Sequence, residues 1–222
     1  MITQNLRIKF EPYIQLLTDV PVSETEQGFS MLNVGADFEI PLKENLVNKG
    51  KGQNYGAELT VEHFFDKNFY FLTTLSLYSS KYTDYEGTQR NTEFNGNFVY
   101  NLLGGYEFKL WKNSKLAINA KTVWAGGKRY VPILSEESVN AGYIIYDWDN
   151  AYTDKRDDFF RLDLNIRLKI NRKRVSHEIG IELQNLTNHQ NIFTKYFDVY
   201  SGTYKKEYQV GFFALPTYKI YF

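Results

Sequence analysis

The residues best suited to bind a ligand lie in and beside one long stretch, residues 127–157, that is rich in aromatic rings. Two neighbouring cations and five rings form the candidate set: Lys128, Arg129, Tyr130, Tyr143, Tyr146, Trp148 and Tyr152. Rings and cations together bind organic chelates or sugars well. We expect these side chains to line a ligand-facing vestibule, although an ordinary packed loop has the same composition and stays open as an alternative.

Other chemistry has little support in the residues. The chain has no Cys and only three His, which fall in separate segments, so thiolate chemistry and Cys-ligated zinc are excluded. Asp147, Asp149, Asn150 and Asp154 lack the Gly and bidentate Glu of an EF-hand. Neither a nucleophile elbow nor a phosphate-binding glycine loop is present. We expect no enzymatic activity, no cofactor and no resident metal.

Charge and hydropathy limit the classes of partner that this chain can bind. The 26 Lys and Arg balance the 26 Asp and Glu, which gives no electrostatic footprint for nucleic acid. No apolar run reaches the roughly 18 to 20 residues of a spanning helix, and Arg7, Lys9 and Glu11 stand where a signal peptide would have its apolar core. A spanning β-strand needs only about 9 to 11 residues and alternates sides, so a membrane protein remains possible.

The elements that position the candidate residues show a period of two. Residues 160–170 alternate strictly between apolar side chains, such as Leu164 and Ile166, and polar ones, such as Asn165 and Arg167. A strand places these two sets on opposite faces, whereas a helix would scatter them. The same rule predicts further strands around 6–11, 57–62, 71–78, 100–109, 116–124, 178–184 and 217–222, which makes about eight in all.

The connections between these strands alternate in length. Short turns are predicted at about 65–68, 111–114 and 171–174, and long loops at about 17–50, 81–97, 127–157 and 189–206. Outer-membrane barrels have this asymmetry between short periplasmic turns and long extracellular loops, whereas a soluble sandwich has no general reason for it.

The two faces of the strands differ sharply. Almost all ionisable side chains of the predicted strands fall on the polar faces, and aromatic residues recur near strand ends, as in the girdles of outer-membrane strands. A hydrocarbon environment requires such exclusion of charge, but so does a packed protein core, so a soluble antiparallel sheet remains an alternative. Pro216 removes a ladder donor, and we expect a local irregularity there.

At these residues the chain resembles the C-terminal β-barrel portion of TonB-dependent outer-membrane receptors. The segments that carry the resemblance are Asn54–Thr60, Phe94–Asn97, Ala125–Tyr130, Glu182–Asn188 and Tyr208–Phe222. The resemblance implies that Tyr218, Ile220 and Phe222 match the terminal signal read by the outer-membrane assembly machinery. It also implies a location in the bacterial cell outer membrane and contact with the lipid bilayer.

The fold expected is therefore all-β: an antiparallel up-and-down transmembrane β-barrel segment of about eight strands. Residues 1–222 would be the C-terminal part of the receptor barrel, without plug domain or signal peptide, so the chain looks like a fragment with about a third of a 22-stranded barrel. Its partners would be the missing N-terminal strands and plug, and TonB indirectly through the plug. We expect a curved partial barrel, with closure into a small barrel as the alternative.

Three hypotheses for function follow. The resemblance implies a barrel segment for TonB-energised uptake of a nutrient such as a ferric siderophore, vitamin B12 or a glycan, not competent alone. The second hypothesis is an autonomous eight-stranded outer-membrane protein with a structural or adhesive role. The third is a soluble β-sandwich that binds ligand through its loops.

Overall fold

The computed structural model describes residues 4–35 and 45–222. The chain is all-β, with a single short α-helix in the described part. The long strands are β1 (Leu6–Ser23), β2 (Leu46–Asp66), β3 (Phe69–Thr83), β5 (Phe98–Trp111), β6 (Ser114–Ala125), β7 (Phe159–Asn171), β8 (Ser176–Gln184) and β11 (Phe213–Tyr221). The smaller elements are η1 (Met31–Asn33), β4 (Gln89–Asn91), α1 (Ser135–Ala141), β9 (Ile192–Asp198) and β10 (Thr203–Tyr208).

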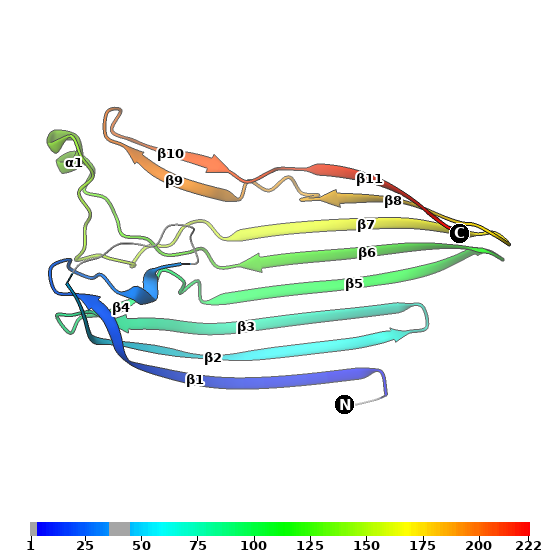
Figure 1. Ribbon diagram of the computed structural model, residues 1–222, viewed down its shortest axis with the longest axis horizontal. Helices are drawn as coiled ribbons and strands as arrows, with labels where there is room; N and C mark the ends of the chain where they lie inside the picture. The colour runs from blue at the N-terminus through cyan, green and yellow to red at the C-terminus, as the bar shows by residue number, and fades with distance from the viewer. Residues whose placement is uncertain (1–3, 36–44) are drawn as a thin grey trace.

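The eight long strands form one antiparallel sheet in the order β1-β2-β3-β5-β6-β7-β8-β11 (Figure 1). Strand β4 adds to β3, and β9 pairs with β10 as a separate hairpin. Each predicted strand corresponds to one of the eight, so the predicted antiparallel sheet is confirmed. The register places apolar residues opposite apolar residues on neighbouring strands. For example, Ile166 pairs with both Ile118 and Ile181.

The two ends of the sheet differ as predicted (Figure 1). Tight turns join β2 to β3, β5 to β6 and β7 to β8, and long connections lie at the opposite end. Lys67 and Asn68 both have positive φ, at 47° and 73°, which is the type I′ geometry that matches the twist of a hairpin. We call these two ends the turn end and the loop end.

The predicted long loops were too long. Strand β1 continues to Ser23 and β2 begins at Leu46, so both ends of the predicted loop 17–50 are strand. The loop 189–206 contains most of the β9–β10 hairpin, and 127–157 contains α1. Ladder hydrogen bonds extend the strands past the point where alternation in the sequence becomes irregular.

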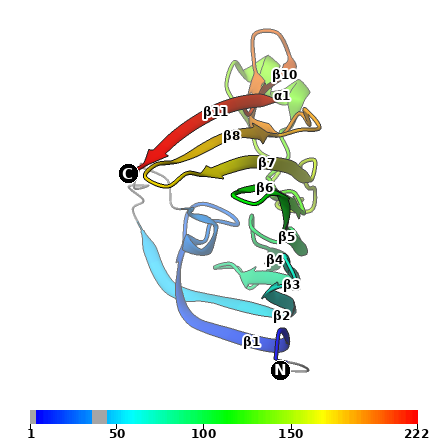
Figure 2. The ribbon, with the colours of Figure 1, turned by 90° about the vertical axis from the view of Figure 1, so that its right-hand side faces the viewer.

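The sheet is open and curved (Figure 2). Strands β1 and β11 are its two edges, and they do not pair with each other in the described part of the chain, so the alternative of a closed small barrel is not realised. The predicted irregularity at Pro216 is wrong, because β11 pairs with β8 in continuous register and Pro216 lies opposite Ile181. An edge strand tolerates proline, since the missing donor can point away from the ladder.

The polar faces of the strands line the concave side. Segment 24–35, which includes η1, lies inside the hollow of the sheet (Figure 2). There it approaches the polar face of β2 so closely that a Cβ at Gly52 would lie 2.7 Å from Cδ1 of Leu32. The convex side is apolar and remains uncovered: Phe10, Ile14 and Leu16 are 65%, 69% and 68% exposed.

The packed core of the described residues sits at the loop end. Tyr82, Ala151 and Tyr152 form its buried centre, with Leu32, Val131 and Trp148 packed around them. These side chains come from β3 and from segments 24–35 and 126–158. We call segments 24–35, 84–97 and 126–158 the loop cap.

Candidate functional site

A cleft of about 420 Å³ opens in the loop cap, between the 127–157 connection and the β9–β10 hairpin. Its lining residues are Glu26, Phe29, Glu93, Arg129, Tyr130, Val131, Ile133, Ile144, Tyr146, Trp148, Tyr152, Arg156, Lys195, Tyr196, Phe197 and Tyr204. Half of the lining residues carry aromatic rings, and charged groups of both signs lie among them. The volume is within the range of small-molecule sites.

The structure brings five of the seven candidate residues to this cleft: Arg129, Tyr130, Tyr146, Trp148 and Tyr152. The other two lie outside its lining. The ammonium of Lys128 is 3.1 Å from a carboxylate oxygen of Glu93 and lies over the ring of Phe94. Tyr143 follows α1 and is 65% exposed.

Arg129 holds the loop cap together from within. Its guanidinium donates to the carbonyl oxygens of Asn95, Tyr152 and Thr153 and to the side-chain oxygen of Asn97. Partial burial lowers the pKa of Arg129, and the nearby carboxylate of Asp154 opposes that shift. Most N–H donors of Arg129 are hydrogen-bonded to the protein. Arg129 therefore positions the wall of the cleft, and few of its donors are left for a ligand.

Lys195 is the cation that the sequence prediction missed. Its ammonium lies 5.1 Å from the ring centroid of Tyr130 and 4.2 Å from that of Tyr204. Neither Lys195 nor Arg156 has an ion pair within residues 4–35 and 45–222. The cleft residues that the sequence analysis missed, such as Lys195, lie on β9 and β10. The sequence does contain a signal for this hairpin inside the predicted loop 189–206: two segments with aromatic residues are separated by Ser201 and Gly202.

Two phenols of the cleft, Tyr130 and Tyr152, have a raised pKa and are neutral donors at ordinary pH. Burial is the main cause that raises the pKa of Tyr152 to about 12, and the negative charge of Glu93 adds to it. Burial also raises the pKa of Tyr130, with Asp154 as the second cause. Such a wall suits a ligand with flat or ring-shaped faces and polar edges.

No group of acidic or His side chains in the described ranges is arranged to hold a metal ion. Helix α1 has seven residues, and no helix in the described part of the chain could cross a bilayer. The groups that line the cleft and could bind a ligand are aromatic rings, phenol hydroxyls and cations.

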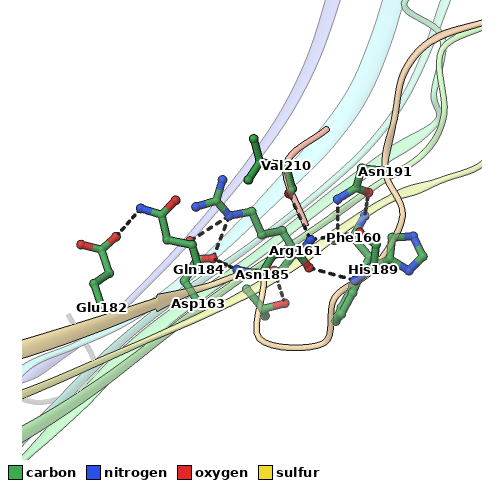
Figure 3. Close-up of polar contacts among 10 residues, drawn as sticks. Phe160, Arg161, Asp163, Glu182, Gln184, Asn185, His189, Asn191 and Val210 are labelled. Atoms are coloured by element: carbon green, nitrogen blue, oxygen red, sulfur yellow. Dashed lines mark hydrogen bonds and ion pairs between the residues drawn. The ribbon is translucent and has the colours of Figure 1, made fainter. Parts of the chain in front are cut away.

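A polar junction joins β7 and β8 to the β9–β10 hairpin (Figure 3). Asn191 imitates a strand partner: its side chain accepts from the backbone N–H of Phe160 and donates to the carbonyl of the same residue. Asn185, with φ of 49°, donates to the carbonyls of His189 and Val210 and accepts from the N–H of His189. The junction fixes the hairpin that supplies Lys195 and Tyr204.

The residues of the predicted assembly signal lie at the turn end, on the convex face. Tyr218 and Ile220 pair with Ile179 and His177 of β8, and the Tyr218 hydroxyl is 2.8 Å from Nδ1 of His177. Tyr218, Ile220 and Phe222 are all exposed. Their role in assembly stays a prediction.

Comparison of the chain with protein-family models, curated proteins and solved structures finds no significant match.

Proposed function

We propose that this chain is part of the barrel wall of a TonB-dependent receptor in the bacterial outer membrane, where it contributes to energised uptake of a nutrient. The single observation that carries the proposal is the convex face of the sheet. That face is apolar from the turn end to beyond the middle of the sheet, carries charged residues such as Lys51 and Lys81 toward the loop end, and is uncovered by any second layer in the described part of the chain.

The uncovered face is what separates this proposal from a soluble sandwich. A sandwich buries its apolar face against a second sheet. Large exposed apolar surfaces are uncommon on soluble monomers and mark contact with another apolar medium. A hydrocarbon bilayer provides that medium over the full width of the sheet.

Two aromatic bands on the convex face support the same proposal. Near the loop end, the rings of Phe98 and Trp124 lie 5.0 Å apart, with Tyr100 beside them. Near the turn end, the rings of Tyr106 and Phe108 lie 4.5 Å apart. Between Tyr100 and Phe108, eight residues at about 3.4 Å each span about 27 Å of strand, or about 21 Å across a bilayer at a tilt of about 40°.

This spacing is close to the apolar band of about 25 Å in outer-membrane barrels. The alternation of tight turns and long loops supports an orientation with the turns toward the periplasm and the loop cap outside the cell. The cleft of Lys195 and its neighbouring rings then faces the medium from which a nutrient arrives.

The open edges of the sheet call for further strands. Unpaired backbone groups of β1 and β11 are not tolerated in hydrocarbon, so we propose that they pair with the remaining strands of the receptor barrel. The concave polar face, with ion pairs such as Arg7–Glu62 and Arg161–Asp163, would line the lumen around a plug through which TonB acts. The outer-membrane assembly machinery would read the terminal residues.

Cysteine scanning tests the proposal, because the chain has no Cys of its own. Leu164→Cys and Ile166→Cys place a fluorescent label on the convex face of β7, and Asn165→Cys and Arg167→Cys place it on the concave face as matched controls. In bilayers that contain nitroxide-labelled lipid, we expect quenching at 164 and 166 and little at 165 and 167. Equal quenching at all four positions, or none, would refute a membrane-spanning β7.

A further inference from the structure

The turn end carries a set of exposed cations that the proposed transport function does not use. Three tight turns supply them: Lys67 between β2 and β3, Lys112 between β5 and β6, and Arg172, Lys173 and Arg174 between β7 and β8. We call these five residues the basic rim. All five are exposed, and none has an ion pair within residues 4–35 and 45–222.

The β5–β6 and β7–β8 turns contain no acidic residue, whereas Asp66, the last residue of β2, stands directly before Lys67. Two other carboxylates at strand ends are engaged elsewhere: Glu107 pairs with Lys115, and Glu178 pairs with Lys219. The opposite end of the sheet mixes both signs, with exposed acidic residues at Glu86, Glu136, Glu137, Asp149 and Asp154 beside exposed cations such as Lys49, Lys51 and Lys155. The chain thus has no net charge, but its tight turns are predominantly basic.

Exposed aromatic residues accompany the cations. Phe65 and Trp111 flank two of the turns, and Trp111 is 68% exposed. Rings and long cationic side chains gather together where a protein surface meets lipid headgroups, because each has an apolar body and a polar tip.

We propose that the basic rim binds the headgroups of anionic phospholipids in the periplasmic leaflet of the membrane. The inference rests on the proposed membrane location of the convex face. The proposed ligand is a lipid because the cations lie just beyond the aromatic band of Tyr106 and Phe108. In the proposed orientation, this position is at the depth of the lipid phosphate groups. Spread over three turns, they suit a row of separate headgroups.

The test measures which lipid collects at the rim. The full chain with Asn113→Cys carries an environment-sensitive dye in the β5–β6 turn, and Glu86→Cys carries it at the loop end as the matched reporter. Both proteins, each within the complete receptor barrel that pairs the two sheet edges, are reconstituted in phosphatidylcholine bilayers that contain equal fractions of either nitroxide-labelled phosphatidylglycerol or nitroxide-labelled phosphatidylcholine, with the nitroxide on the acyl chain near the headgroup.

We expect labelled phosphatidylglycerol to quench the dye at position 113 more strongly than labelled phosphatidylcholine, and the dye at position 86 to show no such preference. A triple variant, Arg172→Gln, Lys173→Gln and Arg174→Gln, should weaken the preference, since each cation strengthens binding to an anionic surface by about fivefold. The control triple variant Lys49→Gln, Lys51→Gln and Lys155→Gln removes equal charge at the loop end and should keep it.

Each other outcome counts against the inference in an identifiable way. Equal quenching by both lipids at position 113, or a preference that survives loss of all three cations, overturns it and leaves the membrane location intact. Inorganic phosphate that removes the preference, where sodium chloride of the same ionic strength does not, assigns the rim to free phosphate and overturns the lipid. Absence of quenching by any lipid overturns the proposed function together with the inference.

Discussion

The wall of eight strands and the loop cap keep their structure by different means. In the cap, side chains bury one another: Tyr82 is 1% exposed, and the Arg90–Asp84 ion pair lies beneath the surface. In the wall, long backbone ladders join strands whose convex face remains open in the described part of the chain and whose concave face is covered only in part, near the loop end. A cap with its own core can hold a defined cleft, whereas the wall depends on the medium around it.

The largest expected effect is on the cap. Tyr82→Ala removes a buried ring that packs edge-on against Tyr152, with centroids 6.0 Å apart, and a hydroxyl that donates to the Gly28 carbonyl at 2.6 Å. We expect a loss of about 3 to 5 kcal/mol in the free energy of unfolding. Chemical denaturation followed by fluorescence of Trp148 measures it.

A matched control for this change is Tyr78→Ala, four residues earlier on the same face of β3. Its hydroxyl donates to the Phe94 carbonyl, but its side chain is less buried. If both variants lost the same stability, the core assigned to the cap would be wrong.

The next effect separates the two faces of the wall. Ile166→Arg puts a charge at the middle of the convex face of β7, where we expect a cost of about 2 to 4 kcal/mol in a bilayer. Asn165→Arg introduces the same charge on the concave face, among Asp163 and Glu182, and should cost much less. Unfolding by urea from lipid vesicles measures both, and equal losses would contradict a lipid-facing convex side.

A pH titration should loosen the cap before the wall. The pKa of Tyr152 is about 12 in the folded chain and 10.0 as the ordinary value, so its contribution is fully present below pH 10 and is lost as the pH rises toward 12. The size of this loss is on the order of 2 kcal/mol. Near-ultraviolet circular dichroism between pH 9 and 12 should show it.

Tyr152→Phe provides the control for this titration, because phenylalanine keeps the ring and removes the ionisable group. The variant should keep more of its cap signal across the same pH range. A pH profile unchanged by Tyr152→Phe would assign the transition to another group, such as Tyr130, whose pKa is also raised, chiefly by burial.

The smallest effect concerns the ion pairs of the concave face. Arg7 and Glu62 lie 2.5 Å apart across β1 and β2, but the Arg7 side chain is half exposed. Replacing Arg7 by Gln should cost less than about 1 kcal/mol, and salt should reduce the difference. Unfolding measured at low and high ionic strength checks this, and a cost comparable to that of Ile166→Arg would show that the concave face is far drier than an aqueous lumen.

The sequence by itself determined the sheet. Strict alternation along residues such as Leu164, Asn165 and Ile166 fixes which side chains share a face, because successive residues of a strand point to opposite sides. Turn residues such as Lys67 and Asn68 fix where neighbouring strands reverse. These features are local, so the order and the polarity of the wall could be predicted from the chain alone.

Tertiary structure decided the cleft and the opening of the sheet. Lys195 meets Tyr130 only because the Asn185 and Asn191 junction sets the angle of a hairpin far along the chain. The separation of β1 from β11 likewise depends on the summed curvature of all the strands between them. Contacts between distant segments depend on many small backbone angles at once, and no local pattern of residues encodes their total.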